Sequence, residues 1–359
     1  MKIYFFIGDL GAGGAEKVLV EMANNLAIEN FDVTIITLSN GDVFYDTNKN
    51  VNVVHLKKYN ISNNFFKAVK NNYRRILSLH KILKSEKPDV IVSFLTQTNI
   101  IAIIAAKLNN IPIIISEHSI YKNRNLNFVW KFLRRLTYPF ANALVCLTKD
   151  DLENYRKYSV KKYVIPNFIS KIPNIAFDEK EDFILAVGRL HPVKRFDYLI
   201  QMYNKLDIDL PLFIIGEGPE RRKLESLIQQ YDLQQKVQLC GLKTDLTEYY
   251  KKAKYFILTS QYEAFPNVLL EAMSFGCIVF SYDCDYGPRN IITDSIDGFL
   301  FEDDSEFNHK WNMLRENIDL QKKIFRNTRK KIQSFHIDKI INLWKEVIFY
   351  VADQKKIYK

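Results

Sequence analysis

The chain has 359 residues, of which 47% are hydrophobic and 26% are charged, and its formal net charge is +10. This length is too great for a single core and predicts two domains of about 150 to 200 residues each. The longest apolar runs, such as "NIIAIIAA", end well short of the roughly 18 residues that a membrane-spanning helix needs, which argues against an integral membrane protein.

The positive charge lies in the first half of the chain. Residues 1–170 contain 23 Lys and Arg against 13 Asp and Glu, whereas the remainder holds 28 of each. Residues 57–87 carry nine basic side chains against one acidic, and residues 121–135 carry five against none. We therefore expect this half to face an anionic partner. The opening apolar run meets a glycine-rich turn and no cleavage site, which predicts a first strand and a cytoplasmic chain.

Short β-branched runs alternate with longer helical patterns along the chain. "KIYFFIG", "DVTIITL", "DVIVSFL" and "IPIIISEH" predict strands, and "AEKVLVEMANNLAIEN" and "NIIAIIAAKLN" predict the helices between them. Such βαβ units wind a parallel sheet. The pattern restarts after the linker "YVIPNFISKIPN". We expect α/β domains over 1–169 and 170–335, and a helix over 336–359 that either crosses back to the first domain or packs elsewhere.

Ligands of open α/β sheets bind at the carboxyl ends of the strands, where two glycine turns are expected. "GDLGAGGAEK" follows the first strand, and Gly13 and Gly14 open a helix whose backbone amides suit an anion. A tight turn explains these glycines equally well, because they match neither the dinucleotide nor the P-loop spacing. "FIIGEGPERRKLE" repeats the arrangement around Gly216. Here the simpler interpretation is that the glycine permits the turn and does not contact a ligand.

Charged side chains follow two other predicted strands. Arg189 comes directly after "ILAVG" and Lys194 stands five residues later, so the two cations can clamp a diphosphate or merely solvate the surface. His118 ends the strand of "IPIIISEH" beside Glu117. A packed or surface histidine is the common alternative to a catalytic one.

The stretch "EAFPNVLLEAMSFG" contains two glutamates eight positions apart. Pro266 suits a first helical turn, which leaves Glu263 in the loop and places Glu271 one turn inside the helix. Asn267 and Val268 then offer amides at the positive end of the helix dipole. A phosphate on these amides with a hydroxyl-rich ring on either side suits a nucleotide sugar, although each glutamate alone is ordinary.

No metal site is predicted. Asp283 and Asp285 form a carboxylate pair, but such a pair recurs by chance, and the four cysteines show no C-x-x-C spacing.

Two basic, aromatic-rich segments suit an interfacial surface, with cations for anionic headgroups and aromatic rings for the acyl boundary. They are "NNFFKAVKNNYRRILSLHKILKSEK" and "YKNRNLNFVWKFLRRLTYPF". The candidate membrane-facing residues are Lys67, Lys70, Arg74, Arg75, Lys131, Arg134 and Arg135. An amphipathic core helix with a solvated basic face is the alternative. Nucleic acid is not expected, because no docking motif or stacking sheet accompanies the charge.

Together these stretches resemble the retaining glycosyltransferases of family 4, which have the GT-B fold of two Rossmann-like doubly wound domains facing across a cleft. The resemblance rests on "GGAEKVLVEMANNLA", "SEHS", "VGRLHPVKRFDYLI", "IIGEGPERRKLE" and "YEAFPNVLLEAMSFGCIVFSYDCDYGPRNII", in this order over nearly the whole chain. One departure is Ala264, where many members have Gly.

The resemblance implies a role for each motif. Glu263 would contact the transferred sugar and Glu271 the nucleotide ribose, while Arg189 and Lys194 would hold the diphosphate. His118 would lie by the reacting face of the sugar. The "GAGG" turn would lie near the phosphates. The implied reaction retains configuration by front-face attack and needs no metal or other cofactor.

The "SEHS" to "FLRRLTYPF" region further resembles bacterial transferases that extend sugars on polyprenyl-diphosphate carriers, including N-acetylgalactosaminyltransferases. This implies a UDP-sugar donor, with GalNAc favoured, and a polyprenyl-diphosphate-linked saccharide acceptor. It also implies a peripheral location on the inner face of the cytoplasmic membrane, in O-antigen, capsule or glycoprotein assembly. The alternatives are a nucleotide-sugar 2-epimerase and a non-catalytic module that binds nucleotide sugar or membrane.

Overall fold

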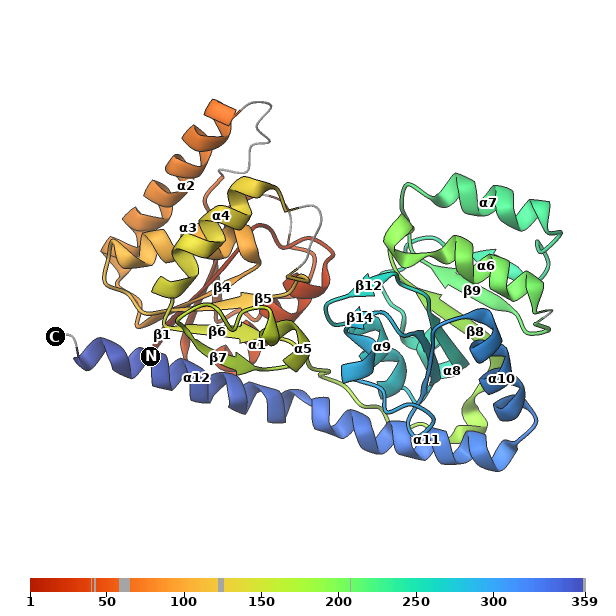
Figure 1. The fold of residues 1–359 in the computed structure, drawn as a ribbon. Coiled ribbons are helices and arrows are strands. Elements are labelled where there is room, and N and C mark those ends of the chain that lie inside the picture. Colours follow the sequence, from red (N-terminus) through yellow and green to blue (C-terminus); the bar gives the residue numbers. More distant parts are fainter. Residues whose placement is uncertain (40, 42, 58–64, 122–125, 207, 358–359) are drawn as a thin grey trace. The chain divides into compact units, whose positions relative to one another are not determined.

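The computed structural model describes residues 1–39, 41, 43–57, 65–121, 126–206 and 208–357 (Figure 1). Its contacts divide the chain into two compact units. The first unit comprises Met1–Asn167 and Asp338–Lys359, and the second comprises Phe168–Ile337. The C-terminal helix, whose destination the sequence leaves open, therefore belongs with the first unit.

The first unit contains one parallel sheet, in which seven strands of the described residues follow the order β3-β2-β1-β4-β5-β6-β7. The strands are β1 (Lys2–Ile7), β2 (Asp32–Thr37), β3 (Val51–His55), β4 (Val90–Phe94), β5 (Ile113–Glu117), β6 (Ala143–Cys146) and β7 (Lys161–Val164). Every residue of β4 and β5 is buried, as expected for parallel strands that are covered on both faces. This burial on both faces explains why β4 and β5 contain unbroken apolar runs in the sequence.

Helices cover both faces of this sheet. They are α1 (Gly14–Ile28), α2 (Phe65–Glu86), α3 (Thr96–Lys107), α4 (Phe128–Thr137), the short η1 (Tyr138–Phe140), α5 (Lys149–Glu153) and α12 (Ile337–Ile357). Helix α3 contacts both α2 and α4, and Figure 1 shows these three together on one face. Helix α12 lies against the α1 side, where Lys345 Nζ is 2.8 Å from Glu29 Oε2.

The second unit repeats the architecture, and its described residues form a parallel sheet of order β10-β9-β8-β11-β13-β15 with a separate β12-β14 pair. The strands are β8 (Glu181–Val187), β9 (Leu212–Ile215), β10 (Val237–Leu239), β11 (Ala253–Leu258), β12 (Tyr262–Glu263), β13 (Ile278–Tyr282), β14 (Asp285–Tyr286) and β15 (Phe299–Phe301). The helices are α6 (Phe196–Lys205), α7 (Arg221–Gln230), α8 (Thr247–Lys252), α9 (Asn267–Ser274), α10 (Asp304–Arg315) and α11 (Ile318–Ile332). Single turns of 3₁₀ helix are η2 (Phe177–Glu179), η3 (Pro192–Lys194), η4 (Pro288–Asn290) and η5 (Gln333–Phe335). Two parallel-sheet α/β units confirm the expected doubly wound fold class.

Gly216 has a packing role at the carboxyl end of β9. Its φ is +146°, which side chains rarely adopt, and a Cβ there would lie 1.9 Å from the carbonyl oxygen of Gly188. The glycine thus allows the loops after β8 and β9 to touch. The loop after β8 carries Arg189 and Lys194, the two cations that the sequence singles out.

Candidate active site

His118 lies at the carboxyl edge of the first sheet, one residue beyond β5. Its Nε2 is 3.0 Å from Ser116 Oγ, and its ring stacks on Phe94 at a centroid distance of 4.7 Å. Its Nδ1 is buried and has no hydrogen-bond partner among the residues that the structure describes. Burial lowers the pKa of His118 to about 3, because the charged imidazolium would lose its hydration. The side chain is therefore a neutral imidazole with one nitrogen that no described residue contacts by a hydrogen bond.

Glu117, the neighbour of His118, is anchored inside the first unit. Its carboxyl group accepts hydrogen bonds from Thr96 Oγ1 at 2.9 Å and from the Tyr138 hydroxyl, with Asn99 Nδ2 at 3.4 Å. Burial raises the pKa of Glu117 to about 7. These bonds hold the end of β5 and so fix the backbone from which His118 projects.

The glycine turn opens α1, as the sequence predicts, with Gly13 as the N-cap and Gly14 as the first helical residue. A carboxylate of the same helix occupies the space that a side chain at Gly13 would fill, since Glu16 Oε2 lies 2.0 Å from a Cβ built there. Burial raises the pKa of Glu16. An anion at this helix terminus would have to replace an acidic group that is already there.

In the second unit, Lys194 and Glu263 are in direct contact although 69 positions separate them. Lys194 Nζ is 2.5 Å from Glu263 Oε1, which also accepts a hydrogen bond from Ser260 Oγ at 2.8 Å. Thr259 Oγ1 donates to the Lys194 carbonyl at 3.0 Å and ties the two loops together. The side chains of Lys194 and Glu263 are 22% and 14% exposed, so both remain partly accessible from solvent. Arg189 follows β8 in the same group of loops and is exposed.

Helix α9 begins at Asn267, one residue later than the sequence predicts, because Pro266 is the N-cap with non-helical backbone angles. Val268 is the second helical residue, so both amides lie in the amino-terminal turn as predicted. Glu271 lies one turn further and accepts a hydrogen bond from the Tyr250 hydroxyl at 3.0 Å. Burial and the adjacent carboxylate raise the pKa of Tyr250 well above its ordinary value, so this hydroxyl stays protonated and donates.

Three contacts of the site residues have no clear signal in the sequence. Ser260 and Tyr250 hold the two glutamates, and Glu16 covers the first glycine turn. A serine three positions before Glu263 or a tyrosine in a short helix is too common to be singled out. Only the fold brings their oxygens to the carboxylates.

Asp283 has a structural partner, because Arg289 Nε donates to its Oδ1 at 3.0 Å. No group of three or more His, Cys, Asp and Glu that would suit a metal ion is found within the described part of the chain.

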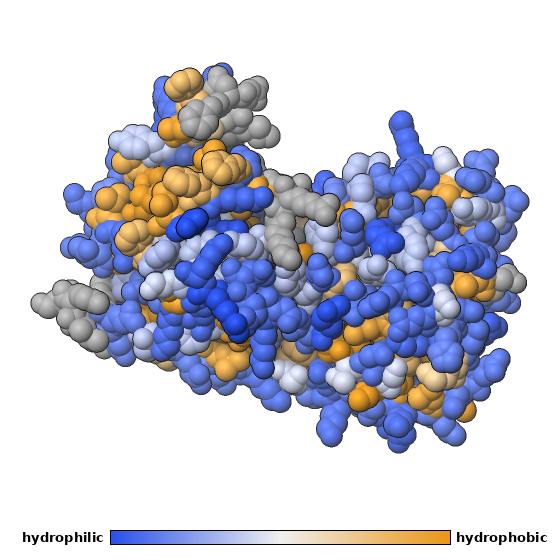
Figure 2. Space-filling model, viewed as in Figure 1, coloured by the Kyte–Doolittle hydropathy of each residue, from blue (hydrophilic) through white to orange (hydrophobic). Residues whose placement is uncertain are grey.

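The basic residues of α2 and α4 lie at the surface with one exception. Exposed hydrophobic residues accompany them, and Figure 2 shows hydrophobic colouring gathered over these helices. The exposed hydrophobic set, which we call the α2–α4 patch, consists of Phe66, Val69, Tyr73, Phe128, Val129, Phe132, Leu136 and Phe140. Lys67, Lys70, Arg74, Lys131 and Arg135 are exposed and Arg75 is half-buried. Residues 63, 64 and 122–125 of the two expected segments lie outside the described residues.

The expectation that Arg134 faces the membrane is wrong. Its side chain enters the first unit and is 3% exposed. The guanidinium lies 3.8 Å from the ring centroid of Tyr121 and 5.8 Å from that of Tyr155. The rings and the carboxyl group of Glu117 compensate the buried cation electrostatically. The arginine therefore links α4 to the interior, and its neighbour Arg135 faces solvent.

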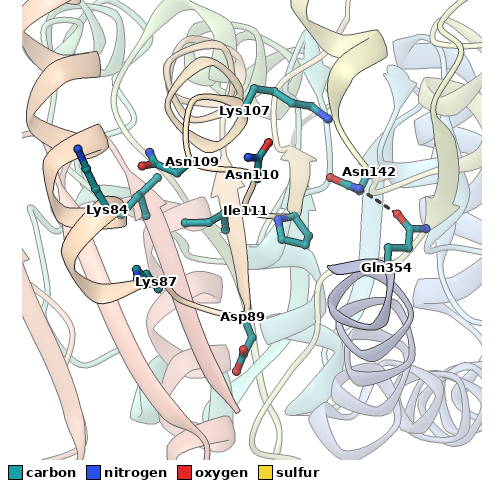
Figure 3. A pocket seen from close by; sticks show the side chains of 11 residues that line it. Lys84, Lys87, Asp89, Lys107, Asn109, Asn110, Ile111, Asn142 and Gln354 are labelled. Atoms are coloured by element: carbon teal, nitrogen blue, oxygen red, sulfur yellow. Dashed lines mark hydrogen bonds between the residues drawn. The ribbon is translucent and has the colours of Figure 1, made fainter. Parts of the chain in front are cut away.

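A hollow of about 1020 Å³ opens at the opposite edge of the first sheet (Figure 3). Its lining includes the residues directly before β4, β5 and β6, which are Asp89, Pro112 and Asn142. The amino ends of the strands therefore form its floor, away from His118. Lys84 and Lys107 add positive charge at its rim. This hollow is not part of the candidate active site.

Known families match both halves of the chain. Residues 12–171 match the family described as Glycosyltransferase Family 4, and residues 168–331 match the family described as Glycosyl transferases group 1. No helix of the described residues is long and apolar enough to cross a membrane.

Individual proteins resemble the chain over four fifths of its length or more. GalNAc-alpha-(1->4)-GalNAc-alpha-(1->3)-diNAcBac-PP-undecaprenol alpha-1,4-N-acetyl-D-galactosaminyltransferase of Campylobacter jejuni is 32% identical, over 98% of this chain and 99% of the relative. UDP-Gal:alpha-D-GlcNAc-diphosphoundecaprenol alpha-1,3-galactosyltransferase of Escherichia coli is 28% identical, over 80% and 81%. Sucrose-phosphate synthase from Thermosynechococcus elongatus superposes with a TM-score of 0.85 at 17% identity, over 98% of this chain and 99% of the other. The chain therefore belongs to the GT-B glycosyltransferases, with a family 4 amino-terminal half and a group 1 carboxyl-terminal half.

Proposed function

We propose that the chain is a retaining hexosyltransferase that moves a hexose or N-acetylhexosamine, with GalNAc favoured, from a UDP-sugar to a polyprenyl-diphosphate-linked saccharide. The two transferase relatives support the substrate class, because their names specify undecaprenyl-diphosphate acceptors, and one name specifies a UDP-sugar donor. A role in bacterial surface polysaccharide or glycoprotein glycan assembly follows from this acceptor class.

The observation that carries the proposal is the contact between Lys194 and Glu263, in which Lys194 comes from the loop that also carries Arg189. A bound diphosphate offers Lys194 a second anionic partner. Glu263 is then available to accept hydrogen bonds from hydroxyl groups of the sugar, while Ser260 keeps the carboxylate in place. In this proposal Glu271, to which the Tyr250 hydroxyl donates, accepts hydrogen bonds from ribose hydroxyls.

Retention of configuration agrees with the linkages that the relatives' names state. Both names describe transferases that make α linkages, and UDP-galactose and UDP-GalNAc carry the sugar in the α configuration. An α product from an α donor requires overall retention. In front-face attack the bond between the anomeric carbon and the diphosphate oxygen breaks as the new glycosidic bond forms. The departing diphosphate oxygen takes the proton from the acceptor hydroxyl.

Catalysis in this proposal is mainly stabilisation of the leaving group. Arg189, Lys194 and the amino-terminal turn of α9 supply preorganised positive charge for the diphosphate, and no metal is invoked. His118 acts as a neutral hydrogen-bonding group, because its imidazole is uncharged and Nδ1 is unused by the described protein.

The α2–α4 patch and the cations beside it support peripheral binding to an anionic membrane. Phe66 and Phe128 are 83% and 80% exposed, which is unusual for phenylalanine in a soluble surface. Apolar side chains that enter the acyl boundary and lysines that meet anionic headgroups form an interfacial surface. We place the enzyme at the inner leaflet, where a lipid-linked acceptor and a cytoplasmic nucleotide sugar meet.

A donor screen tests the proposal. The protein is incubated with UDP-GalNAc, UDP-GlcNAc, UDP-Gal or UDP-Glc and a short polyprenyl-diphosphate saccharide, and products are identified by mass spectrometry. Transfer from one donor that is abolished in Glu263→Ala is the expected result. An epimerised nucleotide sugar formed without acceptor would instead support the 2-epimerase. Binding of UDP without turnover of any donor would support a non-catalytic module.

A further inference from the structure

Three aromatic rings from distant parts of the chain are stacked beneath the candidate site in the first unit. The ring of His118 stacks on Phe94 at 4.7 Å between centroids with 22° between planes. A second neighbour of Phe94 is Trp344, at 6.1 Å and 17°. The ring planes are therefore nearly parallel from α12 through the end of β4 to the residue after β5. We call these three rings the aromatic stack.

The aromatic stack leaves little freedom for the imidazole. Phe94 is 0% exposed and Trp344 is 1% exposed, so neither ring can move without opening the core. The backbone is fixed at the same place, because the Leu95 amide donates to the Ser116 carbonyl at 3.0 Å. Ser116 Oγ also contacts His118 Nε2 at 3.0 Å. Both Phe94 and Ser116, which hold the imidazole, thus belong to buried strands of the first sheet.

The two nitrogens of the imidazole differ in their surroundings. Nδ1 is buried and lacks a partner among the described residues, whereas Nε2 and one ring face are occupied. A buried polar atom without a partner is costly unless a ligand or water supplies one. The position of Nδ1 therefore matters for binding, and the aromatic stack determines that position.

We propose that Trp344 is a positioning residue for His118, and that the returning C-terminal helix is thus part of the catalytic apparatus. The proposal rests on the proposed function, in which His118 contacts the transferred sugar. Trp344 acts through Phe94 and touches no substrate. Loss of its ring lets Phe94 tilt and shifts the imidazole away from the position that the transition state requires. A small displacement of a catalytic group can lower the rate far more than it weakens substrate binding.

Kinetics of three variants test this role. We expect Trp344→Leu to lower kcat about tenfold or more, while KM for the UDP-sugar, whose diphosphate and ribose contacts are proposed in the second unit, changes by less than about twofold. Trp344→Phe keeps an aromatic face against Phe94 and should stay within about threefold of the wild-type kcat. Phe94→Leu removes the middle ring and should repeat the effect of Trp344→Leu, so that one poorly folding variant does not decide the outcome.

Trp311 provides a matched control. It is 2% exposed in the second unit, and its ring neighbours Phe280 and Phe307, at 5.5 Å and 5.7 Å between centroids, belong to the same unit. Trp311→Leu should therefore lower the thermal midpoint as Trp344→Leu does, with kcat of the folded protein unchanged within about twofold. Equal loss of kcat in both leucine variants would reduce Trp344 to a general stabilising residue and overturn the proposal.

Histidine NMR provides a second readout that needs no turnover. The Hε1 resonance of His118, assigned from its absence in His118→Asn, should be shifted by the Phe94 ring current and should not titrate between pH 5 and 8. In Trp344→Leu the chemical shift of this resonance should change, and the pKa of His118 should rise toward its ordinary value. Trp344→Phe should resemble the wild type in both respects. A resonance that is unchanged in Trp344→Leu would refute the positioning role. If the wild type shows no transfer at all, the proposed function fails, and this NMR comparison still decides whether Trp344 positions the imidazole.

Discussion

The hydroxyl of Tyr250 offers a sharp test of the donor site, because it can be removed without removing the ring. Tyr250→Phe deletes the hydrogen bond of 3.0 Å to Glu271 Oε2, while the ring remains buried and stacked on Phe275. A hydrogen bond to a charged group contributes about 1.5 to 3 kcal/mol. Each 1.4 kcal/mol corresponds to about tenfold in affinity. If Glu271 binds the ribose, KM for the UDP-sugar should rise about 10-fold to 100-fold, and kcat should fall by less than about threefold.

The assay measures initial rates over a range of donor concentrations, with UDP binding followed by calorimetry. Tyr203→Phe is the matched control, because the Tyr203 hydroxyl donates to the Leu210 carbonyl at 2.7 Å in the same unit. The control should lose comparable stability with an unchanged KM. A normal KM in Tyr250→Phe, or a loss confined to kcat, would refute the assignment of Glu271 to the ribose.

Three further predictions concern charge. Lys194→Ala and Arg189→Ala should each lower kcat by at least about 100-fold in the transfer assay, the scale of losing one preorganised donor; near-normal turnover in both would remove them from the diphosphate site. For His118, the folded-state pKa of about 3 lies below the ordinary 6.5, so the unfolded chain binds the extra proton as pH falls below 6.5. His118→Asn lacks this proton uptake, so on acidification from pH 6.5 to 4.5 its stability in urea unfolding should rise relative to that of the wild type by up to about 1.4 kcal/mol per pH unit. Parallel stability curves for the two proteins would contradict the neutral imidazole. Sedimentation with liposomes that contain anionic lipid should recover the protein in a salt-sensitive manner and fail for the double variant Phe128→Ser with Phe132→Ser; equal recovery with neutral lipid would argue against the α2–α4 patch as an anionic-membrane surface.

The sequence alone was sufficient for the fold and for the motif positions. Alternating short apolar runs and helical patterns repeat every few tens of residues, and a parallel sheet with helices on both faces is the architecture that buries them. Because ligands of such sheets bind at the strand ends, residues such as His118, Arg189 and Glu263 can be singled out from their position directly after strands. These features depend on the local periodicity of apolar residues, which can be read from a single sequence.

Tertiary packing decided which of these residues meet and which face inward. The amphipathic pattern of α4 does not distinguish Arg134 from Arg135, yet the first is buried between tyrosine rings and the second is exposed. Likewise, nothing near Lys194 in the sequence indicates that Glu263 will neutralise it. Trp344 reaches the stack beneath the site only because the C-terminal helix belongs to the first unit. The physical reason is that contacts between distant segments depend on how helices and loops pack in three dimensions, which the periodicity of each segment alone does not specify.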